Sequence, residues 1–429
     1  MYRLLLIALL SMMLFDGCST HDETPVKAPT QEPMYVDENT LLLFALDAQN
    51  HHQFGKAVGY YDLLYTKTKE EIYQKESLKA LLQGRYYKDL VQRLQTRQQN
   101  GEKLSETERY YLIVSLVELK EFTLAEKEAK ALIAEYPVEK SYLLLAEVYI
   151  KQKDYIQALA ALEKAYKLNY SERVLDQISV LIYANMKSPY EAISRIEQHI
   201  KTFGYSLALT KRLVAFYGDQ RDEAGLLKYY PHLYELDPSK ANGDVVVQLY
   251  WNAKEIIKLI AFLEKSGVND PLLLKLYTEE KNFKKAIPLA QKLYEESGDL
   301  DYLGQKAIFE YENAQGRVEG KLLDSIISDL TKVVKVKEEG YYLNYLGYCL
   351  IDHDRDIPKG ISYVKRALEV EPDSGYFIDS LAWGYYKEGR CEEAMKLMDR
   401  VVEALGKDDP EVKAHLKAIK SCIKKEKTK

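Results

Sequence analysis

Small and large apolar residues recur along the chain at a spacing of about 34 positions. The clearest copy spans residues 141–169. Tyr149 lies three positions after Ala146, and Ala158 lies twelve positions after Ala146. Leu162 and Ala165 are the remaining members of this copy. Two antiparallel helices approach closely only where side chains are small, and large side chains fill the space around such points. The pattern therefore predicts a helical hairpin over residues 141–169.

The same register continues on both sides of this hairpin. Ala125 precedes Ala158 by 33 residues, and Ala192 follows it by 34. A lone hairpin cannot bury its apolar face, whereas stacked neighbours can. Near the carboxyl end the register is carried by Gly347, Pro372, Ala382 and Ala394.

This arrangement resembles the tetratricopeptide repeat (TPR), a pair of helices of about 34 residues. The resemblance implies an all-α fold, a TPR-type α-solenoid in which antiparallel helix hairpins form a right-handed superhelix. We expect the solenoid over residues 40–408, with about ten to eleven repeats that are degenerate between 203 and 267. A capping helix and a basic tail are expected over residues 409–429.

The first residues are typical of an export signal. Arg3 precedes an apolar run from Leu4 to Phe15, which is too short to span a bilayer. Residues 15–18, Phe-Asp-Gly-Cys, resemble the lipobox of bacterial lipoproteins, although Asp16 stands where that family prefers a small uncharged residue. The resemblance implies a signal peptide over residues 1–17 and acylation of Cys18. The alternative is an ordinary secretory peptide with an incidental cysteine.

The segment that follows is polar and contains several prolines, so we expect a disordered tether over residues 18–39. In the lipoproteins of double-membraned bacteria, aspartate after the lipidated cysteine favours retention at the inner membrane. Ser19 stands there in this chain. The resemblance therefore implies an exported, lipid-anchored protein at the periplasmic face of the outer membrane.

The last two repeats resemble a narrower group. Residues 343–348, 367–373 and 378–386 are similar to the carboxy-terminal repeats of proteobacterial TPR lipoproteins. Some of those proteins are adaptors of periplasmic carboxyl-terminal processing proteases. The resemblance implies a membrane-anchored adaptor that recruits a protease or hydrolase to its substrates. The alternative is a structural scaffold of an envelope assembly, such as a secretion, polysaccharide-export or flagellar-motor complex.

In a TPR superhelix the first helix of each hairpin lines the concave surface. In the last two repeats this surface is aromatic and polar, a combination that is enriched at protein interfaces. The repeat that begins near Glu139 has Lys140, Leu143, Glu147 and Ile150 at the corresponding positions. We therefore predict a partner-binding groove near the carboxyl end, unless these aromatics only pack between adjacent hairpins. Its residues are Tyr341, Asn344, Tyr348, Tyr376, Asp379, Trp383, Tyr386 and Lys387.

Composition and motifs argue against other classes of function. The chain has 60 basic and 66 acidic residues, without the basic excess typical of nucleic-acid binding. Catalytic and cofactor fingerprints are missing, so we expect neither an enzyme nor a cofactor. Residues 352–356 alternate carboxylates but lack the glycine and glutamate of a calcium loop, which favours a solvated loop.

The cysteines complete the chemical inventory. Cys349, Cys391 and Cys422 lie far apart in the sequence, and no Cys-x-x-Cys pair is present, so we predict no metal site. If Cys18 is acylated, the three others can form one disulfide and leave one free thiol in an exported protein. The sequence does not identify the pair.

Overall fold

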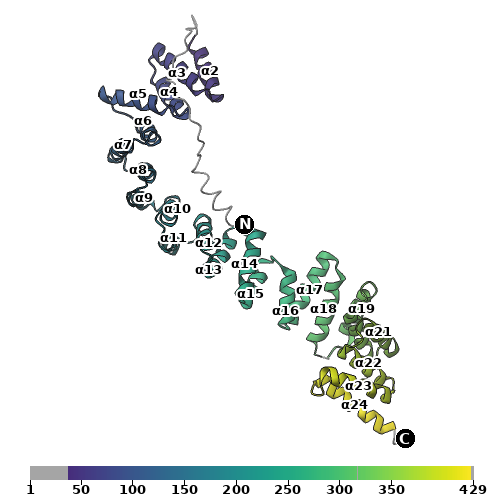
Figure 1. Ribbon diagram of the computed structural model, residues 1–429. Coiled ribbons are helices and arrows are strands. Elements are labelled where there is room, and N and C mark those ends of the chain that lie inside the picture. The colour runs from purple at the N-terminus through teal and green to yellow at the C-terminus, as the bar shows by residue number, and fades with distance from the viewer. Residues whose placement is uncertain (1–36, 316, 427–429) are drawn as a thin grey trace. The chain divides into compact units, whose positions relative to one another are not determined.

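The computed structural model describes residues 37–315 and 317–426, and the regular elements of these residues are all helices (Figure 1). The expected signal peptide, Cys18 and nearly all of the expected tether lie outside the described residues. None of the described helices is long and apolar enough to cross a membrane. The helices belong to two compact units: an N-terminal unit up to Leu249 and a C-terminal unit from Tyr250 onward.

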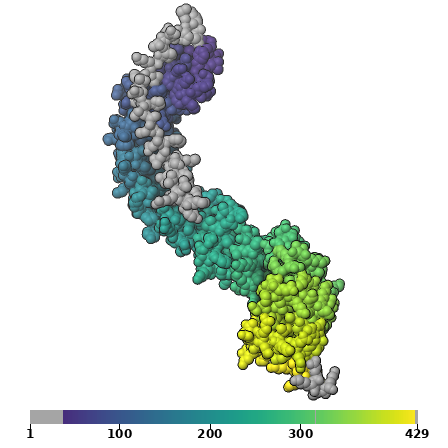
Figure 2. Space-filling view, turned by 45° about the vertical axis from the view of Figure 1, so that its right-hand side comes forward, coloured from purple at the N-terminus to yellow at the C-terminus, as the bar shows by residue number. Residues whose placement is uncertain are grey.

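In the N-terminal unit, successive helices pack as six hairpins. Segments close in sequence, which have neighbouring colours in Figure 2, lie side by side. The helices are α2 (Glu38–Asn50), α3 (Phe54–Thr68), α4 (Glu71–Gln83), α5 (Tyr87–Gln99), α6 (Glu106–Glu118), α7 (Phe122–Glu135), α8 (Glu139–Gln152), α9 (Tyr155–Asn169), α10 (Glu172–Val180) with the π-helical turn η1 (Leu181–Asn185), α11 (Pro189–Phe203), α12 (Leu207–Gln220) and α13 (Glu223–Leu236).

The division between the units falls within α14 (Lys240–Asn252). In the C-terminal unit four further hairpins, α16 to α23, are followed by a single last helix. The helices are α15 (Ile256–Ser266), α16 (Asp270–Glu279), α17 (Phe283–Ser297), α18 (Leu300–Asn313), α19 (Gly320–Val334), α20 (Gly340–Asp352), α21 (Ile357–Val370), α22 (Gly375–Lys387), α23 (Cys391–Leu405) and α24 (Pro410–Glu426).

The expected all-α stack of helical hairpins is confirmed. The small residues that define the register, among them Ala158 and Ala394, are fully buried, and Tyr149 is buried beside them. Pro372 lies exposed in the turn between α21 and α22, where a residue without an amide proton ends a helix. The other small positions, also buried, are Ala125, Ala146, Ala165, Ala192, Gly347 and Ala382.

Helix starts follow from local hydrogen bonds. The first described helix begins at Glu38, two residues before the expected start of the solenoid, and the Asp37 carboxylate caps it by accepting from the amide of Thr40 at 3.1 Å. At α6, Ser105 and Glu108 form a reciprocal capping box. The degenerate stretch 203–267 contains Pro231 inside α13 as well as the division between the units.

One backbone feature recurs with the repeat. In each described hairpin a residue with positive φ stands in the turn between the two helices, because the chain must reverse there within a few residues. Only the last of these is glycine, which adopts positive φ without a steric penalty. The set is His52, Arg85, Lys120, Lys153, Lys187 and Arg221 in the N-terminal unit, and Lys281, Gln315, Asp354 and Gly389 in the C-terminal unit.

Tyrosine hydroxyls also connect neighbouring hairpins at the repeat spacing. Tyr73 donates to Glu38 over a separation of 35 residues, and Tyr183 donates to Asp219 over 36. In the C-terminal unit, Tyr345 donates to a carboxylate that precedes it by 33 residues. Some of the 36 tyrosines of the chain thus make repeat-to-repeat contacts in both units.

Candidate partner-binding site

The predicted groove residues lie on α20 and α22, which glycines bring close to α21. A Cβ atom added at Gly347 would lie 2.8 Å from the carbonyl oxygen of Gly360, so α20 and α21 cross almost in backbone contact. Gly384 leaves similar room for Ile361 against α22. Residues three or four apart share one helix face. Each of the two helices therefore carries its predicted residues as one stripe.

We call the aromatic side chains of these faces the aromatic stripe: Tyr341, Tyr345 and Tyr348 of α20 with Tyr376, Trp383 and Tyr386 of α22. On α20 the rings of Tyr341 and Tyr345 meet edge to face, with centroids 5.2 Å apart. The Tyr345 hydroxyl donates to Glu312 of α18 at 2.7 Å. These contacts hold the α20 part of the stripe against α18.

On α22, Trp383 is the centre of the stripe. Its indole ring stacks on Tyr386, with centroids 4.7 Å apart, and its Nε1 donates to Asp352 at 2.9 Å. The ammonium group of Lys387 donates to both carboxylate oxygens of Asp354 at 3.0 Å. Asp352, at the end of α20, and Asp354, in the following loop, thus contact α22, while residues 354–356 are exposed as a solvated loop would be.

The last helix, α24, packs against part of the predicted groove. His415 stacks on Trp383, with ring centroids 4.1 Å apart, and its Nδ1 lies 2.8 Å from Asp379 Oδ2. The Tyr348 hydroxyl donates to Glu411 at 2.6 Å. These contacts mean that α24 shields Asp379 and one face of Trp383 from an external partner.

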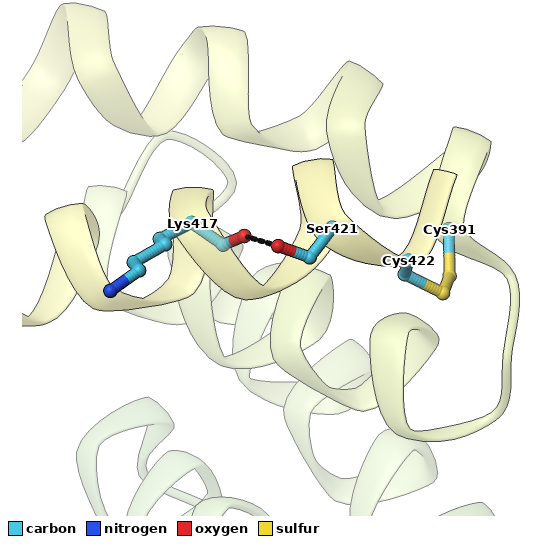
Figure 3. The surroundings of a disulfide bond; sticks show 4 residues. All are labelled: Cys391, Lys417, Ser421 and Cys422. Atoms are coloured by element: carbon cyan, nitrogen blue, oxygen red, sulfur yellow. Dashed lines mark hydrogen bonds between the residues drawn. A yellow bond between two sulfur atoms is a disulfide. The ribbon is translucent and has the colours of Figure 1, made fainter. Parts of the chain in front are cut away.

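A disulfide fastens the end of α24 to α23. Cys391 and Cys422 are bonded, with Cα atoms 6.1 Å apart (Figure 3). One residue before Cys422, the Ser421 hydroxyl donates to the carbonyl of Lys417 within α24 at 2.9 Å. The pair that the sequence left open is thus Cys391–Cys422, and Cys349 is a buried free thiol.

The predicted groove residues therefore differ in accessibility. Asn344 and Asp379 are buried, while the Tyr341 and Tyr376 side chains are 45% and 65% exposed. Tyr348 and Trp383 take part in internal contacts. Some of the aromatics thus pack between helices, and two of them face solvent.

Two carboxylates, Glu312 and Glu411, accept hydrogen bonds from the stripe. Burial raises the pKa of Tyr345 and Tyr348, and the carboxylates of Glu312 and Glu411 raise it further. The two hydroxyls therefore stay protonated donors, and both carboxylates remain exposed beside the rings. Aromatic faces flanked by carboxylates attract cationic groups.

Sequence reasoning missed the residues outside α20 and α22 that complete this region. Glu312 could have been found from the repeat spacing, since it precedes Tyr345 by 33 residues. Glu411 and His415 are four residues apart, which places them on one face of a helix. Together with Asp379 they bring three ligand-type atoms within 4.8 Å of one another, a group that can hold a metal ion.

Comparisons with known proteins give structural neighbours of low similarity. No family model and no curated protein matches the sequence. The structure is similar to the TPR domain of P58(IPK), with 13% identity over 92% of this chain and 100% of that one and a TM-score of 0.28. Yeast Tom70 is 11% identical over 91% of this chain and 96% of that one, with a TM-score of 0.31. YrrB, a TPR protein with an unusual peptide-binding site, is 13% identical over 44% of this chain and 97% of that one, with a TM-score of 0.35.

All three TM-scores are low, and the helix pairs and the buried register positions given above define the fold.

Proposed function

We propose that the chain is a non-catalytic TPR-type scaffold that binds partner proteins through the aromatic stripe of its C-terminal unit. The observation that carries this proposal is the exposure of Tyr341 and Tyr376, at equivalent positions 35 residues apart in successive repeats. Large exposed aromatics with a hydrogen-bonding tip are typical anchors of protein interfaces. They stand on a framework that internal hydrogen bonds already hold in place, which lowers the entropy lost on binding.

The charge of the region indicates the chemistry of the partner. Glu312 and Glu411 are exposed beside the stripe, and Lys387 is already paired with Asp354. A partner segment with Lys or Arg side chains would gain cation–π contacts with the tyrosines and charge complementarity with the carboxylates. We therefore propose an extended, basic segment as the ligand.

The proposed cellular role is that of an adaptor in the bacterial envelope, anchored by lipid on Cys18 at the periplasmic face of the outer membrane and recruiting a periplasmic protease or hydrolase. Its supports are the resemblance of residues 15–18 to a lipobox and the Cys391–Cys422 disulfide, since disulfides persist in oxidising compartments. The second candidate, a structural scaffold of an envelope assembly, uses the same surface with a permanent partner.

The binding proposal is tested with Tyr341→Ala combined with Tyr376→Ala. Both side chains are exposed, so the variant should keep its fold, checked by circular dichroism. We expect crosslinking in detergent-solubilised envelopes to recover a partner with the parent chain, and the affinity measured with that purified partner to fall about tenfold or more. The matched control is Tyr190→Ala, because Tyr190 is 82% exposed on α11, outside the stripe. Equal affinity for both variants would refute the proposal.

The nature of the captured partner separates the two cellular roles. A soluble protease or hydrolase supports the adaptor, and a stable multiprotein complex supports the structural scaffold. The anchor is tested by Cys18→Ala, which should abolish labelling by radioactive palmitate and move the chain from the membrane fraction to the soluble fraction. Unchanged labelling would eliminate the proposed anchor without affecting the binding proposal.

A further inference from the structure

A histidine and two carboxylates converge where α24 meets α22. Glu411 and His415 project from one face of α24, and Asp379 reaches them from α22. One ligand-type atom of each residue lies within 4.8 Å of the other two. Asp379 Oδ2 and His415 Nδ1 are the closest pair, at 2.8 Å.

The hydrogen bonds of the protein do not satisfy this group completely. Asp379 is 6% exposed and His415 is 4% exposed, so both are withdrawn from solvent. The Oδ1 atom of Asp379 is buried and has no hydrogen-bond partner among the described residues. A buried carboxylate oxygen without a donor is unfavourable unless a cation or another donor compensates it. A cation bound beside Asp379 would compensate this oxygen.

Neighbouring side chains orient two of the three groups. The Trp383 indole stacks on the His415 ring at an interplanar angle of 13°, which limits rotation of the imidazole. The Tyr348 hydroxyl donates to Glu411 at 2.6 Å. Metal ligands are commonly held by such surrounding contacts, which set ring orientation and ligand basicity.

We propose that Asp379, Glu411 and His415 bind one Zn²⁺ ion that joins α24 to α22. An imidazole nitrogen with two carboxylates suits zinc, and three protein ligands leave a fourth position for water. Calcium is disfavoured because it prefers about six to eight oxygen ligands. In the zinc-bound state His415 is a neutral imidazole with its proton on Nε2, a second proton, if present, is released to solvent, and Asp379 coordinates the ion instead of forming the hydrogen bond with Nδ1.

The zinc site would help to hold α24 in place, which the disulfide does only at the carboxyl end of this helix. Cys422 fixes α24 seven residues beyond His415, towards its carboxyl end. A zinc ion at Glu411 and His415 would hold the first turns of the same helix. The two connections together would keep α24 against Trp383. This inference does not depend on the proposed partner.

The experiment uses the full chain, stripped of metal by a chelator, with its disulfide intact. Zn²⁺ alone is titrated by calorimetry, and Co²⁺ alone is followed by its visible absorption, which reports the coordination geometry. We expect one equivalent of either ion, and an increase in the thermal unfolding midpoint of the C-terminal unit when zinc is present. Glu411→Gln should weaken zinc binding at least tenfold, and Asp379→Asn or His415→Gln should abolish it.

Controls distinguish this site from nonspecific binding. His51 and Asp47 also form a histidine–carboxylate pair four residues apart, but the pair is exposed at the end of α2 and has no third ligand among the described residues. His51→Gln should leave the zinc affinity unchanged, and Cys349→Ser should do the same. Because Glu411 is exposed, its variant tests the site without disturbing the fold. Failure to bind one equivalent of zinc, or equal affinity in the parent and Glu411→Gln, would show that Asp379 and His415 form only a hydrogen bond.

Discussion

The hairpins α8–α9 and α20–α21 share a packing principle but present different surfaces. Each closes on small buried residues, Ala158 in the first and Gly360 in the second. Their first helices differ: in α8, Lys140 lies over the Tyr110 ring at 4.8 Å, whereas α20 carries the exposed Tyr341. The positions that pack the repeat are therefore separate from those that can contact a partner, so binding chemistry can vary while the fold is maintained.

The two regions also differ in covalent cross-linking. Among the described residues, only the hairpin α22–α23, which follows α20–α21, has a disulfide. This bond joins α23 to α24. The two regions should therefore respond differently to reduction.

Removing the disulfide should loosen α24 selectively. Cys391 and Cys422 close a loop with a sequence separation of 31 residues, and breaking such a loop costs roughly 3 kcal/mol of stability through the entropy of the unfolded chain. The variant Cys391→Ser with Cys422→Ser should show faster amide exchange in α24 and unchanged exchange in α8 and α9. Equal acceleration in both regions would contradict the independence of their packing.

Overfilling the α8–α9 crossing should destabilise the N-terminal unit. Ala158→Leu introduces a large side chain at a fully buried position and should lower the free energy of unfolding by about 1–3 kcal/mol. Thermal melts followed by circular dichroism measure the change. The matched control is Ala160→Leu, because Ala160 is exposed on the same helix. A variant at Ala158 as stable as this control would show that the crossing is looser than described.

The Ala158 position also shows what could be predicted from sequence. Helical hairpins follow from the spacing of small and large apolar residues, because that spacing decides which side chains two helices can bury against each other. The aromatic stripe could be placed on α20 and α22 by the same register. Its accessibility could not, because the contacts of Tyr348 and Asp379 with α24 depend on how residues one or two repeats apart meet in space.

The positive-φ turns were also beyond the reach of sequence. Glycine or asparagine normally indicates such a residue, but most hairpins of this chain have lysine or arginine there. The disulfide partners were undetermined for a related reason. Both cysteines had to be placed on their helices before their distance could be judged.

Substitutions of the turn residues should change the stability of the two units in opposite directions. Lys153 has φ 64° in the α8–α9 turn, and Gly389 has φ 78° in the α22–α23 turn. Lys153→Gly should stabilise the N-terminal unit by up to about 1 kcal/mol, because glycine has no Cβ to clash in this conformation. Gly389→Ala should destabilise the C-terminal unit by a similar amount. Urea unfolding measures both, and a loss of stability in Lys153→Gly would contradict the assigned backbone conformation.

The smallest expected effect concerns a polar link between α8 and the following hairpin, and it depends on pH. Glu139 accepts hydrogen bonds from the Asn169 amide at 2.8 Å and from the Arg173 guanidinium. The Asn169 hydrogen bond, followed by that of Arg173, lowers the pKa of Glu139 below its ordinary value of 4.5. The stabilisation is therefore fully present above the pKa of the unfolded chain and is lost as pH falls through the lower pKa of the folded chain.

The variant Glu139→Gln should accordingly unfold about 0.5 kcal/mol more easily than the parent at pH 7, since Arg173 is largely exposed and solvent screens the pair. The difference should shrink as the pH is lowered and vanish once the parent carboxyl is protonated in both states. Urea midpoints for the parent, Glu139→Gln, Arg173→Ala and the double variant at two pH values isolate the pair from other effects. A difference that persists unchanged in acid would assign the stabilisation to packing of the Glu139 side chain instead of to its charge.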